Sequence, residues 1–295
     1  MTEGESFPAG GVSPELQELA RTAAFEGGVL AMRWFQPGAR TRARVWTKGK
    51  GSPVTEADVE VDTFLRHRLT ADCGEIGWLS EETADSLERL ERRLIFVVDP
   101  IDGTRAFLEG DPRWCVSIAL VLDGLPVAAV VHAPALQMTH EAIRGGPALL
   151  NGRPMRVSQA SCLSQARVAG PRFLLDALTG TCAGIVPIAK IPSLANRLCR
   201  VADGSLDAAL ASADAKDWDI AAAHLIIERA GGRLADLDGI SPLYNRTRTS
   251  HGRLFAAPSE GFARMLGEVR RAAGLPEKNL TATECAAAAR ESARR

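Results

Sequence analysis

One stretch of the chain constrains its fold and chemistry more than any other: Val97-Val98-Asp99-Pro100-Ile101-Asp102-Gly103-Thr104. The apolar, partly β-branched run over residues 94–98 predicts a strand. Because Pro100 lacks the N–H that would continue a ladder, we expect this strand to end near Asp99. Asp99 and Asp102 then share a tight turn, where two hard oxygen ligands can converge on a divalent cation such as Mg²⁺.

The two residues after this turn suit an anion. Gly103 lets the backbone approach a ligand closely, and if Thr104 opens a helix, the free N–H groups at its start would face a phosphate. The same residues also fit an Asp-rich turn in which Asp102 is a helix N-cap, a common use of aspartate. Local sequence leaves both interpretations open.

Four segments, taken in order, resemble the motifs of the inositol monophosphatase family of lithium-sensitive, magnesium-dependent phosphomonoesterases. Residues 99–104 resemble its DPIDGT signature. Upstream, Lys48 and residues 51–58 resemble its K…SPVTxAD segment, and residues 80–83 resemble its GEE(S/T) segment. Downstream, residues 218–222 with 230–232 resemble its WDxAA…AGG block. The resemblance runs from residue 15 to 258 and implies an α/β fold of the layered αβαβα type.

The resemblance also implies a metal site and a set of substrate contacts. It implies that about two or three Mg²⁺ ions clamp a small phosphate monoester, that Li⁺ inhibits, and that a homodimer is possible. The implied metal ligands are Glu81, Asp99, the Ile101 carbonyl, Asp102 and Asp219. The expected substrate contacts are Glu81, Asp102, Gly103, Thr104, Ser193, Arg197 and Asp219.

Three residues are implied to handle the attacking water. Asp58 would bond the Thr104 hydroxyl, which orients the water, and Glu82 would act as a base beside it. The local sequence offers simpler roles for these and neighbouring acids: Asp58 as the capping partner of Thr55, and Glu81-Glu82 as a solvated acidic loop. Asp219 could equally be a first-turn helix acid.

Lys48 is a weaker candidate for the phosphate site. It could neutralise charge near the phosphate or be a solvated lysine of the basic run over residues 40–50. Asp217 departs from the small or apolar residue that many relatives carry before the tryptophan, and the sequence does not say whether its charge faces the substrate.

Substrate choice depends on residues later in the chain. Residues 193–197 resemble the G/S-x-x-x-K pattern of the bacterial 3′(2′),5′-bisphosphate nucleotidase branch, with Arg197 in place of the lysine. A guanidinium can grip a second phosphate bidentately, which favours hydrolysis of 3′-phosphoadenosine 5′-phosphate to AMP, although Arg197 could also be a surface residue of an amphipathic helix. Inositol-1-phosphate and histidinol phosphate are alternative substrates, and a silent phosphate-binding relative is the non-enzymatic alternative.

Composition excludes several other classes. Lys and Arg total 35 against 36 Asp and Glu among 295 residues, so no basic field attracts a nucleic acid polymer or an anionic membrane. Apolar stretches end well before the ~20 residues of a membrane span, and the N-terminus lacks a signal pattern. Six cysteines without a C-x-x-C pair suggest neither zinc nor disulfides. We therefore expect a cytoplasmic protein.

The predicted elements divide the chain into two subdomains. Helices are expected over residues 15–35, 55–69, 193–203 and 219–230, and strands over 76–79, 94–98, 116–122, 127–131, 167–169 and 185–187, with a hairpin turn at Asp123-Gly124. We expect a mobile N-terminus (1–12), an α+β subdomain with most metal ligands (13–158), an α/β subdomain with Asp219 and the substrate-selecting residues (159–270), and a tail (271–295).

Overall fold

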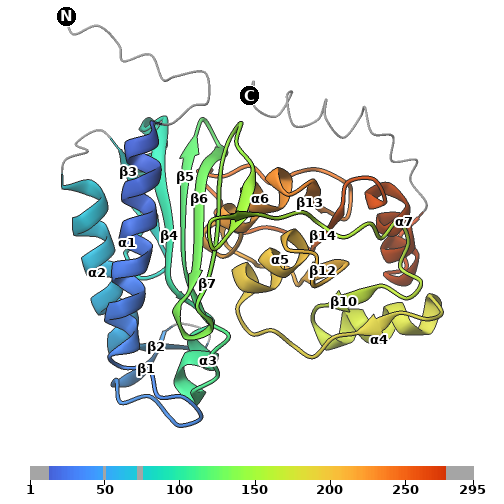
Figure 1. Ribbon diagram of the computed structural model, residues 1–295, viewed down its shortest axis with the longest axis horizontal. Helices are drawn as coiled ribbons and strands as arrows, with labels where there is room; N and C mark the ends of the chain where they lie inside the picture. The colour runs from blue at the N-terminus through green and yellow to red at the C-terminus, as the bar shows by residue number, and fades with distance from the viewer. Residues whose placement is uncertain (1–12, 49–50, 72–75, 277–295) are drawn as a thin grey trace, which may run out of the picture.

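The computed structural model describes residues 13–48, 51–71 and 76–276. It has five layers, in the order helices, sheet, helices, sheet, helices (Figure 1). The predicted αβαβα sandwich of the α/β class is therefore confirmed. The predicted N-terminal segment 1–12 and residues 277–295 of the predicted tail lie outside the described residues. Residues 271 and 272, placed in that tail, instead belong to the last helix.

Seven strands form the larger sheet, in the spatial order β3-β4-β5-β6-β7-β8-β9. β3 runs parallel to β4, and the other neighbouring pairs are antiparallel. The predicted turn at Asp123-Gly124 joins β5 to β6, with φ of 50° and 81° at its two residues. The strands are β3 (Gly77–Ser80), β4 (Leu94–Asp102), β5 (Cys115–Leu122), β6 (Leu125–Ala133), β7 (Met138–Ile143), β8 (Ala148–Leu150) and β9 (Arg153–Pro154).

β4 does not end near Asp99 as predicted. Asp99 pairs with Ser117 and Asp102 pairs with Cys115, so three steps along β4 face two steps along β5. The extra residue is a bulge around Pro100, which removes one ladder bond without ending the strand. The bulge lies between the two aspartates and changes their register relative to β5.

Helices α1 (Pro14–Met32) and α2 (Glu56–Thr70) cover one face of this sheet. Ser13 caps α1, and Thr55 caps α2 as predicted. The first helix ends at Met32 rather than at residue 35, because the chain turns away before Pro37, which cannot continue a helix. The two-stranded hairpin of β1 (Val45–Lys48) and β2 (Ser52–Thr55) leads into α2.

The smaller sheet has five strands in the order β11-β10-β12-β14-β13. Its strands are β10 (Arg167–Ala169), β11 (Val186–Pro187), β12 (Ala208–Ala211), β13 (Gly232–Asp236) and β14 (Leu254–Pro258). The predicted subdomain boundary near residue 158 lies between β9 and β10. On the outer face of this sheet pack α4 (Arg172–Thr181) and α7 (Phe262–Ala272).

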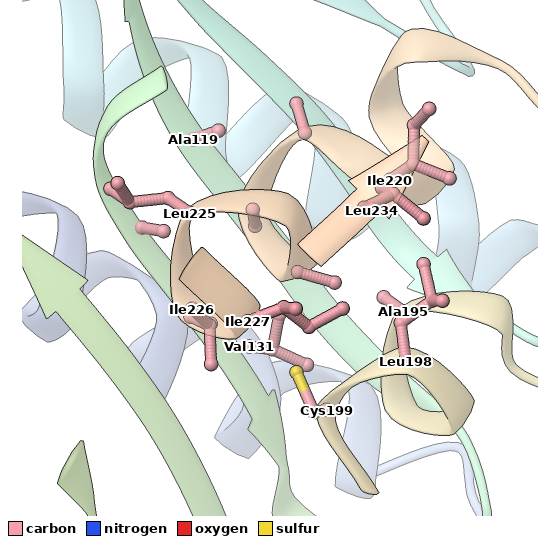
Figure 2. Packing of buried hydrophobic residues seen from close by; sticks show 14 of the residues in the cluster. Ala119, Val131, Ala195, Leu198, Cys199, Ile220, Leu225, Ile226, Ile227 and Leu234 are labelled. Atoms are coloured by element: carbon pink, nitrogen blue, oxygen red, sulfur yellow. The ribbon is translucent and has the colours of Figure 1, made fainter. Parts of the chain in front are cut away.

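Helices α5 (Leu194–Ala202) and α6 (Asp217–Arg229) form the middle layer. Figure 2 shows Ile226 and Ile227 of α6 packing beside Val131 of β6 and Cys199 of α5. α6 is buried on nearly all sides, which explains its run of alanine and isoleucine. The two halves thus share one core, and α6 reaches the larger sheet from the second half. No helix within the described ranges is long and apolar enough to cross a bilayer.

Candidate metal-dependent active site

The turn after the β4 bulge holds the first site residues. Asp99 is buried, and its Oδ1 accepts a hydrogen bond from the N–H of Ile101 over 3.0 Å. Gly103 has φ +96°, and a Cβ there would lie 3.2 Å from the Ser193 side chain, so only glycine fits without strain. Thr104 begins the short helix α3 (Thr104–Glu109), as predicted. Its N-cap is Gly103, so the alternative role of Asp102 as the cap of this helix is wrong.

Three carboxylates from three elements converge beside this turn. Glu81 follows β3, Asp99 lies on β4 and Asp219 lies in the first turn of α6, and one carboxylate oxygen from each lies within 4.8 Å of the others. Burial, and then the neighbouring charges of Glu81, Asp102 and Asp219, raise the pKa of Asp99 well above its usual value. Like charges held this close favour either protonation or a bound cation.

Asp219 also has the simpler role that its position suggested. Its Oδ2 accepts a hydrogen bond from the N–H of Lys216 over 2.7 Å at the start of α6, so it serves as a helix-start acid as well as a member of the cluster. Burial, followed by the charge of Asp102, raises its pKa well above the usual value. The same carboxylate therefore accepts a hydrogen bond at the start of α6 and also belongs to the acidic cluster.

The carboxylate of Asp102 is turned toward the start of α5. It accepts hydrogen bonds from Ser193 Oγ (2.6 Å), the N–H of Ala195 (2.6 Å) and the N–H of Leu194 (3.3 Å). Asp102 is therefore not one of the three carboxylates that converge within 4.8 Å, and its hydrogen bonds tie the turn after β4 to the second half of the chain. The Ser193 hydroxyl is fully buried and also accepts from the N–H of Asn196, so it contacts Asp102 and the helix rather than an open substrate pocket.

Asp58 combines the two roles that the sequence offered. Its Oδ2 accepts from the N–H of Thr55 over 2.7 Å, which completes a capping box at the start of α2. Its Oδ1 accepts from Thr104 Oγ1 over 3.2 Å, and the same hydroxyl lies 3.2 Å from the carbonyl oxygen of Ile101. Asp58 is buried, and burial raises its pKa.

Lys48 and the two glutamates form one charged group. Lys48 makes a close ion pair with Glu82, and its Nζ lies 3.8 Å from Glu81 Oε1. The Glu82 side chain is only 4% exposed, and burial raises its pKa to about 7 despite the lysine. The interpretation of Glu81-Glu82 as a solvated loop, and of Lys48 as a solvated lysine, is therefore wrong. A carboxyl with a pKa near 7 is suited to exchange protons with a water.

Arg197 corrects an expectation about substrate binding. Its side chain is buried, so the alternative role as a surface residue is wrong. Its Nε and Nη2 donate to the carbonyl oxygen of Ile191 over 3.2 and 2.8 Å, and Nη1 donates to that of Leu210 over 3.0 Å. The bidentate grip expected on a second phosphate is thus made on a backbone carbonyl.

Asp217 faces away from the cluster. It is fully buried, with Oδ1 2.7 Å from His251 Nε2 and Oδ2 accepting from the N–H of Asn245 over 3.0 Å. Its charge therefore serves the packing of α6 against the loop before β14 and does not meet substrate. This partner was not predictable from the sequence, because His251 lies 34 positions away along the chain.

A cavity opens beside Asp219. Its volume is about 940 Å³ including the mouth, within the range of about 300–1,000 Å³ typical of small-molecule sites. Gly170, Arg172, Lys190, Arg197 and Ser212 are among its lining residues. The space next to the carboxylate cluster can therefore hold a sugar-sized or nucleoside-sized group.

Asp62 is one residue near the site that the sequence analysis missed. It is buried on α2, one turn after Asp58, and its carboxylate bonds the hydroxyls of Ser80 and Thr83 on either side of the glutamate pair. The signal was present in the spacing: positions i and i+4 lie on the same face of a helix.

Comparisons with known proteins indicate the same family as the motifs do. The model of the inositol monophosphatase family matches residues 14–273. The histidinol-phosphatase of Mycobacterium tuberculosis is 37% identical over 67% of this chain and 79% of its own, and the inositol monophosphatase 2 of Solanum lycopersicum is 35% identical over 76% and 88%. The 3′(2′),5′-bisphosphate nucleotidase CysQ of Aggregatibacter actinomycetemcomitans is 31% identical over 68% and 77%.

A solved structure shows the same fold. The extragenic suppressor protein suhB of Bartonella henselae superimposes with a TM-score of 0.75 and 25% identity, covering 87% of this chain and 99% of its own. The resemblance seen in the motifs is thus confirmed along nearly the whole described chain, and the carboxylate cluster lies where those motifs meet. The chain belongs to the inositol monophosphatase family, a family of phosphatases that hydrolyse phosphate monoesters.

Proposed function

We propose that the chain hydrolyses a small phosphate monoester with Mg²⁺ as its cofactor. The observation that carries the proposal is the convergence of Glu81, Asp99 and Asp219, from three separate elements, to within 4.8 Å. The donor set fits Mg²⁺, because it consists of hard carboxylate oxygens and contains no thiolate or imidazole. Burial and mutual repulsion raise the pKa of Asp99 and of Asp219. A bound divalent cation would relieve this repulsion.

The residues that would hold the metal are Glu81, Asp99, Asp219, the Ile101 carbonyl and Asp102, for about two or three ions in all. When bound, Mg²⁺ supplies Lewis acidity that lowers the pKa of a water and neutralises charge on the phosphate. Asp102 is already held by three donors, and this fixes the orientation of its remaining lone pairs. The expected phosphate contacts include Gly103 and Thr104 at the start of α3.

The chain's own residues would move the proton of the attacking water. Thr104 Oγ1 donates to Asp58, so a lone pair of the hydroxyl is left to accept a hydrogen bond from the water and aim it at phosphorus. Glu82, with a pKa of about 7, is suited to take the proton near neutral pH, and Lys48 beside it stabilises its charged form.

The test is phosphate release by the purified protein as Mg²⁺ is added. We expect activity that requires Mg²⁺, is inhibited by Li⁺, and falls by on the order of 10³-fold in Asp99→Asn. Asp207→Asn is the matched control, because Asp207 is also buried and hydrogen-bonded but pairs with Arg167 outside the cluster. Loss of activity in both variants, or in neither, would contradict the assignment.

The identity of the leaving group is a finer part of the proposal. The names of the relatives indicate histidinol phosphate, inositol phosphate and bisphosphorylated nucleotides as candidates. Arg197 no longer supports the nucleotide, but the cavity beside Asp219 is lined by two other exposed cations, Lys190 and Arg172. Arg172 has a loose pairing with Asp176 at 3.6 Å, whereas Lys190 has no ion-pair partner among the described residues.

Apart from the cluster residue Asp219, the charged residues that line this cavity are Arg172, Lys190, Arg197 and one acid, Asp214. Their net positive charge favours an anionic leaving group over histidinol, which is itself cationic, and over neutral inositol. We therefore keep 3′-phosphoadenosine 5′-phosphate as the proposed substrate, with Lys190 in the role first given to Arg197. Adenosine 3′-monophosphate is the matched substrate, because it lacks only the 5′-phosphate. Lys190→Ala should lower kcat/KM about tenfold for the bisphosphate and leave the monophosphate unchanged. Faster hydrolysis of inositol-1-phosphate or histidinol phosphate would overturn this choice alone.

A homodimer and a cytoplasmic location remain expectations from the resemblance and from the sequence. Light scattering of the purified protein would measure the first, and fractionation of the producing cells would measure the second. Neither result bears on the metal site, whose residues all come from one chain.

A further inference from the structure

A buried carboxylate next to the site has no role in the proposed chemistry. Asp62 is 6% exposed and lies on α2, within hydrogen-bond distance of Ser80 at the end of β3. It accepts a close hydrogen bond from the Ser80 hydroxyl and a second from Thr83 Oγ1 over 2.6 Å. Within the described chain it has no ion-pair partner, so these two hydroxyls are the groups that stabilise its charge.

The two hydroxyls bracket the glutamate pair. Ser80 precedes Glu81 and Thr83 follows Glu82, so a single carboxylate fixes the turn at both ends. Two weaker bonds converge on the same hydroxyls: the N–H of Glu82 donates to Ser80 Oγ over 3.5 Å, and Trp78 Nε1 donates to Thr83 Oγ1 over 3.3 Å. The conformation of this turn therefore depends on Asp62.

Helix α2 carries two such carboxylates one turn apart. Asp58 bonds the hydroxyl of Thr104 at the start of α3, and Asp62 bonds the turn that carries Glu81 and Glu82. A rigid helix thus sets the distance between the residue expected to aim the water and the residues expected to bind the metal and take the proton. Mutation of a side chain that holds a metal ligand in place typically lowers metal affinity by about 10–100-fold.

We propose that Asp62 is a positioning residue that holds Glu81 in the geometry needed to bind the metal and Glu82 in the geometry needed to take the proton. The inference rests on the proposed Mg²⁺ site and goes beyond it, since Asp62 itself would touch neither metal nor substrate. Its carboxylate accepts from Ser80 at Oδ1 and from Thr83 at Oδ2. In Asp62→Asn one of these two oxygens becomes an NH₂ group, which donates hydrogen bonds and cannot accept them.

The test measures binding of Mg²⁺ alone by calorimetry, without substrate, together with thermal unfolding. In Asp62→Asn one hydroxyl loses its acceptor, and we expect the dissociation constant for Mg²⁺ to rise by about tenfold or more. Asp207→Asn should lower the unfolding temperature comparably and leave Mg²⁺ affinity unchanged. If Asp62→Asn behaves like Asp207→Asn in both measurements, the inference is wrong and Asp62 is structural only.

A second pair of variants covers the case in which Asp62→Asn does not fold. Thr83→Val removes one of the two hydroxyls at almost constant volume, and Thr83→Ser keeps it. We expect weaker Mg²⁺ binding in Thr83→Val and recovery in Thr83→Ser. Equal affinity in these two variants would overturn the inference, whereas absence of Mg²⁺ binding in the unmodified protein would overturn the proposed metal site itself.

Discussion

The hydroxyl of Thr104 donates a hydrogen bond to Oδ1 of Asp58 over 3.2 Å, across 46 positions of the sequence. The other oxygen of the same carboxylate caps α2 through the N–H of Thr55. One aspartate therefore joins the starts of two helices, and its contribution to stability can be separated from its contribution to catalysis by changing its partners one at a time.

Thr104→Val should abolish most activity without loosening α2. The variant removes the hydroxyl that would orient the attacking water, so we expect kcat to fall by about 10²–10⁴-fold. The capping box of Thr55 and Asp58 does not involve Thr104, so the unfolding temperature should change little. Steady-state kinetics and thermal unfolding of the same preparation measure the two effects.

The contrasting variant is Thr55→Ala, which removes the capping hydroxyl. We expect a loss of about 1 kcal/mol in the free energy of unfolding, with a smaller fall in kcat than in Thr104→Val. Were Thr55→Ala to reduce kcat as far as Thr104→Val, the hydroxyl of Thr104 would have no special role in orienting water.

The fold was largely predictable because its signals are local. Ser13, Thr55 and Ser193 cap helices where the sequence predicts helix starts, and Asp123-Gly124 makes the predicted hairpin turn. The β4 bulge was missed, because a proline ends a strand in some contexts and bulges it in others, and the choice depends on the neighbouring strand.

The partners of buried charges were less predictable than the site itself. The carboxylate cluster follows from motifs, but the contacts of Arg197 with Ile191 and of Asp217 with His251 depend on how elements far apart in the sequence pack. A buried arginine and a surface arginine look alike in a helical pattern. The residue types of the site were therefore predictable from the sequence, but the role of each charged residue was not.

Binding of Mg²⁺ should stabilise the protein more at pH 7.5 than at pH 5. Asp99 and Asp219 have a pKa raised above the usual carboxyl value in the folded protein, and the pKa of Glu82 rises to about 7. The folded state then binds more protons than the unfolded state, so metal-free stability falls as pH rises from about 4 through 7. Mg²⁺ replaces those protons, and at 100 times its dissociation constant it adds about 2.7 kcal/mol.

Asp219→Asn is the matched variant for this effect. Removing one of the three clustered charges should leave the metal-free protein at least as stable at pH 7.5 and remove the gain from Mg²⁺. Thermal unfolding with and without Mg²⁺ at the two pH values measures both. An equal gain at pH 5 and pH 7.5, or a gain that persists in Asp219→Asn, would argue against the cluster as the metal site.

His132 should make the protein sensitive to acid independently of the metal. It is buried against Phe25 and hydrogen-bonded to Thr139, and burial lowers its pKa to about 4. Because the unfolded state keeps a pKa near 6.5, it binds more protons below that pH, and stability is lost as pH falls from about 6.5 to 4. The difference between the folded and unfolded pKa of His132 corresponds to roughly 3 kcal/mol of stability.

His132→Asn should be less stable than the unmodified protein at pH 7, because it leaves a void beside Phe25, but it should lose less on acidification. The free energy of unfolding in urea, measured from pH 4.5 to 7.5, shows how steeply the stability of each protein depends on pH. If the free energy of unfolding changes with pH equally in the two proteins, the pKa of His132 does not differ between the folded and unfolded states.

Arg197→Met should lower stability without changing substrate preference. The variant leaves the carbonyls of Ile191 and Leu210 without their buried donors, and we expect a loss of about 3 kcal/mol in the free energy of unfolding. Nε and Nη2 of Arg197 already donate to the carbonyl oxygen of Ile191. The ratio of kcat/KM for 3′-phosphoadenosine 5′-phosphate to kcat/KM for adenosine 3′-monophosphate should therefore stay constant. Lys190→Ala should do the opposite, changing the ratio at nearly constant stability. A selective loss on the bisphosphate in Arg197→Met, with an unchanged unfolding temperature, would return the second-phosphate contact to Arg197.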